Sequence, residues 1–117
     1  MCELDVYVKR ADSSSKVASE VTYARAEYGA LAVRDVFGST KKFESAIISE
    51  IDINRERMEL RESPILGSIL QFISACDDCL STGKYETDVQ DRWEEVKARG
   101  DQMIRNLWIK FEKAKVR

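Results

Sequence analysis

The chain has 117 residues, of which 44% are hydrophobic and 34% are charged, so it is long enough for a buried core and is expected to be globular. Its net charge of -2 gives no overall attraction to nucleic acid or to a membrane surface. Glu3 and Asp5 interrupt the first residues, which argues against a signal peptide, and no stretch approaches the roughly 20 apolar residues of a membrane span. We therefore expect a cytoplasmic protein that does not contact a membrane.

The chain contains three cysteines and no histidine. Without histidine it cannot use a histidine base, a serine–histidine or cysteine–histidine nucleophile, or a histidine-ligated metal. Three cysteines are too few for a disulfide framework, so we expect free thiols in a reducing compartment. We predict that the protein is not an enzyme and that any metal is held by thiolate, carboxylate or backbone groups.

Residues 1–62 consist of short apolar stretches separated by turns, which is typical of strands. The first stretch, residues 1–9, alternates strictly and is followed by a polar connection at residues 11–16. Further strands are expected at residues 17–27, 30–36, 42–53 and 57–61. The phase of the stretch 42–53 slips at Ile47 and Ile48, which indicates a bulge or a strong bend. This pattern predicts a small, meandering antiparallel β-barrel.

At Ser63 the pattern changes to helical spacing. Ser63 and Pro64 suit the start of a helix over residues 64–82, which Gly83 would end. A second helix is expected at about residues 88–113, with a possible kink at Gly100. Residues 63–117 are therefore predicted to form a helical hairpin, joined without a flexible linker and packed on the barrel or at a dimer interface.

The second helix carries a row of large apolar residues on one face. The row consists of Val89, Trp93, Val96, Met103, Leu107, Trp108 and Phe111. Two interpretations stay open, because spacing does not reveal what covers a stripe: the row is the core of the hairpin, or it is a surface for a partner.

Cys2 is the candidate metal ligand, in phase with Leu4, Val6 and Val8 on the first strand. If Met1 is removed, which the small size of Cys2 allows, the residue offers an α-amino nitrogen and a thiolate. Cys2 from two chains then completes a four-coordinate set of nitrogen and sulfur, which suits nickel(II) or copper(II). The alternative is structural, with a small apolar side chain closing the end of a barrel strand.

Five short sequence blocks within residues 1–61 carry a resemblance to a known family. They are Met1-Cys2-Glu3, Arg34-Asp35-Val36-Phe37-Gly38, Lys41-Lys42, Ile48-Ser49-Glu50-Ile51-Asp52 and Met58-Glu59-Leu60. Together they resemble the CooT family, small proteins associated with nickel delivery for carbon monoxide dehydrogenase. The resemblance implies an SH3-like barrel, a dimer, and nickel bound by the cysteine at position two, which is Cys2 here. It does not extend into the helical half.

A second thiol motif, Cys76-Asp77-Asp78-Cys79, falls in the first predicted helix. A structural zinc site needs further ligands that the chain does not provide, and a redox pair is normally placed at a helix N-terminus rather than in mid-helix. We therefore interpret Cys76 as a core thiol and Cys79 as a thiol at the edge of the core.

Basic residues flank several strand ends, at Lys9-Arg10, Lys41-Lys42, Arg55 and Arg57, and Tyr7, Tyr23 and Tyr28 lie near them in sequence. Tyrosines among cations could stack the bases of single-stranded RNA. Members of the CooT family have also been labelled RNA-binding, by analogy of fold. Acidic residues on the same strands instead indicate an ordinary solvated exterior.

These observations predict an α+β protein with a small SH3-like antiparallel β-barrel over residues 1–62 and a helical hairpin over residues 63–117. The predicted function is nickel(II) binding through Cys2 for storage, delivery or sensing, with a second copy of the chain and a nickel-enzyme client as partners. An RNA-binding small-barrel module is the first alternative, and an interaction adaptor that works through the C-terminal helices is the second.

Overall fold

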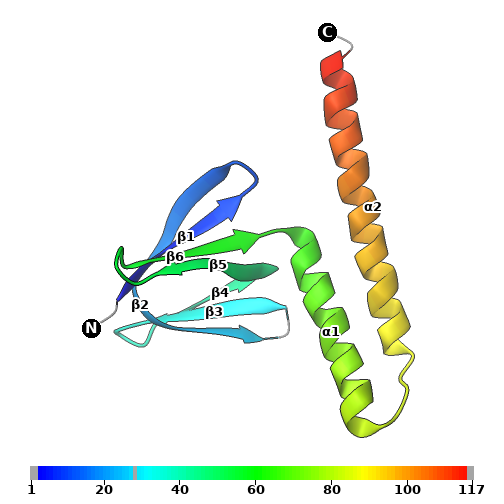
Figure 1. The fold of residues 1–117 in the computed structure, drawn as a ribbon, viewed down its shortest axis with the longest axis horizontal. Helices are drawn as coiled ribbons and strands as arrows, with labels where there is room; N and C mark the ends of the chain where they lie inside the picture. Colours follow the sequence, from blue (N-terminus) through cyan, green and yellow to red (C-terminus); the bar gives the residue numbers. More distant parts are fainter. Residues whose placement is uncertain (1–2, 28, 116–117) are drawn as a thin grey trace.

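The computed structural model describes residues 3–27 and 29–115, with side chains as far as Glu112, and consists of a curled sheet followed by two helices (Figure 1). Along the chain the elements are β1 (Leu4–Arg10), β2 (Ser13–Glu27), β3 (Ala30–Asp35), β4 (Thr40–Glu44), β5 (Ala46–Asp52), β6 (Arg57–Glu62), α1 (Pro64–Thr82) and α2 (Asp88–Lys115). This confirms the predicted α+β class, with a small barrel-like sheet and a helical hairpin.

The six strands form one sheet in the order β4-β3-β2-β1-β6-β5. β1 and β6 are parallel and the other neighbours are antiparallel, so the sheet is mixed rather than a simple meander. It curls into a half-barrel whose concave face holds the core (Figure 1). The parallel pair places the start of β1 beside the start of β6 and the end of β1 beside the end of β6, where α1 follows.

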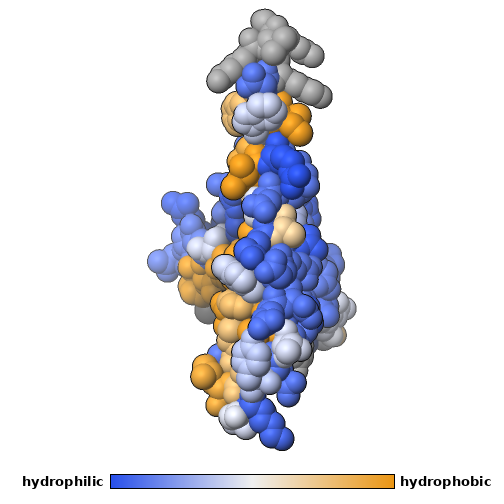
Figure 2. Space-filling model, turned by 90° about the vertical axis from the view of Figure 1, so that its right-hand side faces the viewer, coloured by the Kyte–Doolittle hydropathy of each residue, from blue (hydrophilic) through white to orange (hydrophobic). Residues whose placement is uncertain are grey.

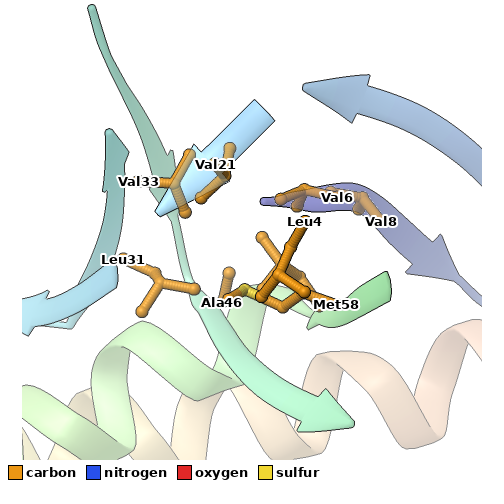
Figure 3. Close-up of a cluster of buried hydrophobic side chains, with 9 residues drawn as sticks. Leu4, Val6, Val8, Val21, Leu31, Val33, Ala46 and Met58 are labelled. Atoms are coloured by element: carbon orange, nitrogen blue, oxygen red, sulfur yellow. The ribbon is translucent and has the colours of Figure 1, made fainter. Parts of the chain in front are cut away.

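The core lies between the inner faces of β1, β2, β3 and β6 (Figure 3). Leu4, Val6 and Val8 of β1 are all buried, as their alternation predicts, and Leu60 of β6 is completely inaccessible. Val21, Leu31, Val33, Ala46 and Met58 complete the cluster. Because the side chains of a strand alternate between its faces, three buried residues fix β1 in register and hold its first residue at the edge of the core.

Two sequence predictions about the strands are wrong. The polar connection expected at residues 11–16 is mostly strand, because Ser13–Lys16 extends β2 and pairs with the end of β1. The single bent strand expected at residues 42–53 is two strands, and these pair at opposite edges of the sheet. The break falls at Ser45, whose φ of 53° lies in the left-handed region and takes the chain out of the β4 ladder.

Ser45 also joins the sheet to α1. Its N–H donates to the carbonyl oxygen of Gly29 at 3.1 Å, and its carbonyl oxygen accepts from the N–H of Ser63 at 3.1 Å. Its hydroxyl donates to the carbonyl oxygen of Pro64 at 3.1 Å and accepts from the N–H of Gly67 at 2.9 Å. We call this set of contacts the Ser45 junction.

The Ser45 junction needs a glycine at position 67 in α1. A Cβ atom at Gly67 would lie 2.5 Å from Oγ of Ser45, and one at Gly29 would lie 2.9 Å from the carbonyl oxygen of Gly67. Both glycines therefore permit a close approach of the helix to the sheet. The junction explains how a helix can follow β6 directly, as the sequence predicted, with no flexible linker.

The two helices follow the predicted bounds closely. α1 ends at Gly83, whose N–H donates to the carbonyl oxygen of Cys79 at 3.0 Å. Ser63 occupies the N-cap position with extended backbone, but its side chain makes no capping hydrogen bond. α2 runs through Gly100 as one helix, so the expected kink is absent from the part of α2 that the structure describes.

α2 is longer than α1 and extends past it. The hairpin is held by Phe72 against Trp93, with ring centroids 5.2 Å apart, and by Arg92, which donates to the side chain of Gln71 at 2.8 Å. Ile65, in the first turn of α1, lies opposite Gly100. Asp101–Glu112 therefore projects beyond α1 by about 18 Å at 1.5 Å per residue. We call this segment the α2 overhang.

The core interpretation of the apolar row on α2 is wrong for the α2 overhang. Trp93 packs in the hairpin, whereas Leu107, Trp108 and Phe111 are each more than half exposed. α1 is too short to cover the α2 overhang, because α1 begins opposite Gly100 and does not extend alongside the later residues of α2. Among the described residues, neither helix is long and apolar enough to cross a membrane.

Candidate functional site

The first residues of β1 lie at one rim of the half-barrel, on the side away from α1 (Figure 1). Leu4 pairs with Val21 of β2, and Val21 pairs in turn with Asp35 at the end of β3. The N–H of Asp5 donates to the carbonyl oxygen of Glu56 at 2.8 Å. Three segments therefore meet here, and we call them the N-terminal rim: the start of β1 (residues 3–5), the β3–β4 turn (residues 36–39) and the β5–β6 turn (residues 53–56).

The N-terminal rim exposes large apolar side chains. Phe37 is 80% exposed at the tip of the β3–β4 turn, and Val36 beside it and Ile53 in the β5–β6 turn are also exposed. Adjacent strands are about 4.8 Å apart, so Asp35, two strands from Leu4, lies about 10 Å from the start of β1. The exposed apolar tip therefore lies near the start of β1.

The block Arg34-Asp35-Val36-Phe37-Gly38 forms a closed turn that presents Phe37. Oδ1 of Asp35 accepts from the N–H of Phe37 at 2.9 Å and from the N–H of Ser39 at 3.0 Å. Gly38 has a φ of 86°, which a residue with a side chain rarely adopts. Asp35 therefore supplies the acceptor that closes the turn, Gly38 supplies its left-handed position, and Phe37 is the exposed tip between them.

Replacing Asp35 with alanine is expected to lower the free energy of unfolding by about 1–2 kcal/mol, because two backbone N–H groups lose their acceptor. Asp35→Asn keeps a side-chain oxygen at the same place and should recover most of this loss. Urea unfolding of the two variants measures the difference. Equal stability of Asp35→Ala and the unchanged protein would show that the carboxylate does not hold the turn.

Cys2, the predicted metal ligand, lies outside the described residues. Across residues 3–27 and 29–115, no group of three or more cysteine, aspartate or glutamate side chains is placed to hold a metal. Two carboxylates at or next to the N-terminal rim pair with cations: Asp5 pairs with Lys16 at 3.3 Å, and Asp52, just before the β5–β6 turn, pairs with Arg55 at 3.6 Å.

Cys76 and Cys79 are free, half-buried thiols on α1. They lie in the helical hairpin, which begins at the other end of β6 from the N-terminal rim. The adjacent Asp77 and Asp78 do not gather with them into a metal-binding group. Because both thiols are partly buried, their burial does not distinguish a core thiol at Cys76 from a thiol at the edge of the core at Cys79.

The residues proposed for RNA stacking are largely occupied by contacts within the chain. The guanidinium of Arg57 lies 4.0 Å from the centroid of the Tyr7 ring, and that of Arg34 lies 4.3 Å from the Tyr23 ring. Nζ of Lys41 donates to the carbonyl oxygen of Val17 at 2.7 Å. Tyr28 lies outside the described residues. One face of the Tyr7 ring and one face of the Tyr23 ring are thus covered by an arginine of the same chain.

Comparison with known proteins identifies one family for the sheet. The family model described as CO dehydrogenase accessory protein CooT matches residues 1–61, which is just over half of the chain. A crystal structure assigned to CooT from Carboxydothermus hydrogenoformans is similar, with a TM-score of 0.48 and 19% sequence identity, over 53% of this chain and 98% of that chain. Comparison with curated proteins gives no match.

Proposed function

Because the chain belongs to the CooT family of CO dehydrogenase accessory proteins, we propose that it binds nickel(II) through Cys2 for storage, delivery or sensing. CO dehydrogenase is a nickel enzyme, so an accessory protein that holds this metal would have a nickel-enzyme client. Nickel is then cargo, and the chain carries out no reaction of its own. We expect it to act in the cytoplasm, where its cysteines stay reduced.

The donor chemistry of the chain supports this proposal. The chain has no imidazole and three thiols that can bind a metal as thiolates, and Cys76 and Cys79 are half-buried within the hairpin. Cys2 precedes a strand fixed in register by Leu4, Val6 and Val8. Thiolate and backbone nitrogen together suit square-planar nickel(II).

One copy of Cys2 cannot fill a site of roughly four ligands, so we propose that two chains share one metal. The surface that would bring them together is the N-terminal rim. Its exposed Val36, Phe37 and Ile53 give an apolar contact area next to the start of β1. A two-fold axis at this rim would place the same apolar residues of both chains around the two sulfurs.

A nickel titration followed by native mass spectrometry tests this arrangement. We expect saturation at about one nickel per two chains, carried by a species with the mass of an even number of chains. Saturation at one nickel per chain on a single-chain species would contradict the shared site.

A substitution at the N-terminal rim tests the contact between the two chains without changing a metal ligand. Phe37→Asp removes no donor atom but places a charge at the apolar tip, so it should weaken nickel binding and shift the metal-bound form toward assemblies of fewer chains. Lys42→Asp, at an exposed β4 position outside the rim, is the control, and its charge change of about two units is larger than that of Phe37→Asp. Nickel binding that tolerates Phe37→Asp as well as Lys42→Asp would exclude the rim as the contact.

A further inference from the structure

The strongest surface feature outside the proposed metal site is the apolar stripe of the α2 overhang. We define it as Met103, Ile104, Leu107, Trp108 and Phe111. Hydrophobic surface is visible along α2 toward its C-terminal end in Figure 2, which views the molecule from the α2 side. Ile104 is 68% exposed, Trp108 64% and Phe111 61%. Five large apolar side chains on three turns of one helix are far more than a solvated helix face normally carries.

This stripe continues the face that packs on α1. Trp93 and Gly100 face α1, and residues 103, 107 and 111 follow at helical spacing along the same side. The overhang is thus the part of a helix–helix contact surface that α1 is too short to cover. The shape that would cover it best is another helix, placed where a longer α1 would have run.

The space for such a helix is already formed. A cleft of about 680 Å³ lies between the overhang and the half-barrel. Met103 and Leu107 line it on one side, and Ala11, Glu62 and Pro64 line it on the other. A second hollow, of about 410 Å³, lies on the overhang itself among Ile104, Leu107, Trp108 and Phe111.

We propose that the occupant is the α2 overhang of a second copy of this chain, packed antiparallel with a two-fold axis near Leu107. In this arrangement each overhang continues the line of its partner's α1 and inserts toward the cleft beside Pro64. The chain carries both parts of the contact, protruding aromatic residues and a cleft lined by Met103 and Leu107, on the same segment. A surface that supplies both parts is self-complementary, as a two-fold contact requires.

The area of the stripe is sufficient for this contact. Exposed aromatic side chains present about 150–250 Å² each when fully exposed, and the five stripe residues together expose on the order of 500 Å² per chain. Covering the stripe of both chains removes about 1,000 Å² of apolar surface. The cleft lining adds to this, which brings the total into the range of about 1,200–2,000 Å² that specific interfaces bury.

This contact is separate from the proposed nickel site. The cleft lies at the end of β1, at Arg10 and Ala11, whereas the N-terminal rim lies at its start, about 20 Å away along a seven-residue strand. Two chains joined through their overhangs therefore do not bring their N-terminal rims together. If nickel joins chains through the rim, it adds a second association that depends on Cys2.

Sedimentation of the metal-free protein in a chelator tests the overhang contact. Leu107→Asp places a charge at the centre of the contact and should halve the mass of the assembly, with an unchanged far-ultraviolet circular dichroism spectrum. The matched control is Ile109→Asp, an exposed position of α2 outside the stripe, which should leave the mass unchanged. The proposal would be overturned if the unsubstituted protein had the mass of a single chain, or if Leu107→Asp had the same mass as the unsubstituted protein. Either result would mean that a different protein covers the stripe.

A crosslink tests the orientation without depending on nickel. In a background in which Cys2, Cys76 and Cys79 are replaced with serine, Leu107→Cys should oxidise to a covalent dimer, because a residue near a two-fold axis meets its own copy. Disulfide formation needs Cα atoms within about 7 Å, so Ile109→Cys in the same background should not crosslink. Equal crosslinking of the two variants, or none by Leu107→Cys, would contradict the antiparallel arrangement.

Discussion

Cys2→Ser is expected to abolish saturable nickel(II) binding together with the thiolate-to-nickel absorption. A serine hydroxyl stays protonated near neutral pH and is a hard, weak ligand, so it does not replace a thiolate. The fold should remain nearly unchanged, because the pairing of β1 with β2 in the described residues begins at Leu4. A nickel isotherm measures binding, and urea unfolding measures the fold.

The nickel affinity measured in the same titration should depend on pH. Protons compete with nickel for a thiolate, so the affinity of the unsubstituted protein should fall as the pH is lowered. The matched control is the double variant Cys76→Ser, Cys79→Ser, which removes the other two thiols and should keep the isotherm and its pH dependence. If the double variant loses the metal and Cys2→Ser retains it, the site lies on α1.

Gly67→Ala is expected to lower the free energy of unfolding, although it leaves the hydrophobic core intact. The added Cβ would lie 2.5 Å from Oγ of Ser45, so α1 must move away from the sheet or the Ser45 hydroxyl must give up its hydrogen bonds. Overpacking of this kind costs about 1–3 kcal/mol, and the better helix propensity of alanine returns up to about 1 kcal/mol. We expect a net loss of about 1–2 kcal/mol in the free energy of unfolding, measured in urea.

Gly100→Ala is the matched control, because it is also a glycine-to-alanine change in a helix. Its Cβ would lie 3.7 Å from Cδ1 of Ile65, an ordinary contact, so only the propensity difference remains. This variant should gain about 0.5–1 kcal/mol. A loss of the same size in both variants would mean that the close approach at the Ser45 junction is not what limits Gly67.

The sequence predicts β1 and β6 well because both strands alternate without interruption between a buried and an exposed face. Leu4, Val6, Val8, Met58 and Leu60 are all buried as expected. Helix bounds are also predicted well, because Pro64 and Gly83 mark the two ends of α1 chemically. These are features that neighbouring residues determine, so a single sequence contains them.

Features that depend on distant residues are not predicted. Nothing local marks Ser45 as a break, because its left-handed backbone is stabilised by Gly29, Ser63 and Gly67, which are remote in sequence. The exposure of Trp108 and Phe111 likewise depends on where α1 begins relative to α2. In the candidate site, the sequence marks Cys2 and the block around Asp35, but the register of β1, β2 and β3 is needed to show that Phe37 lies at the same rim as the start of β1.

X-ray absorption at the nickel edge separates a site at Cys2 from any other, because it counts the sulfur atoms bound to the metal. We expect two sulfur ligands per nickel in the unsubstituted protein, one from Cys2 of each of two chains. The double variant Cys76→Ser, Cys79→Ser should give the same spectrum, and Cys2→Ser should show no sulfur ligand. A sulfur signal that persists in Cys2→Ser and disappears in the double variant would contradict nickel binding through Cys2.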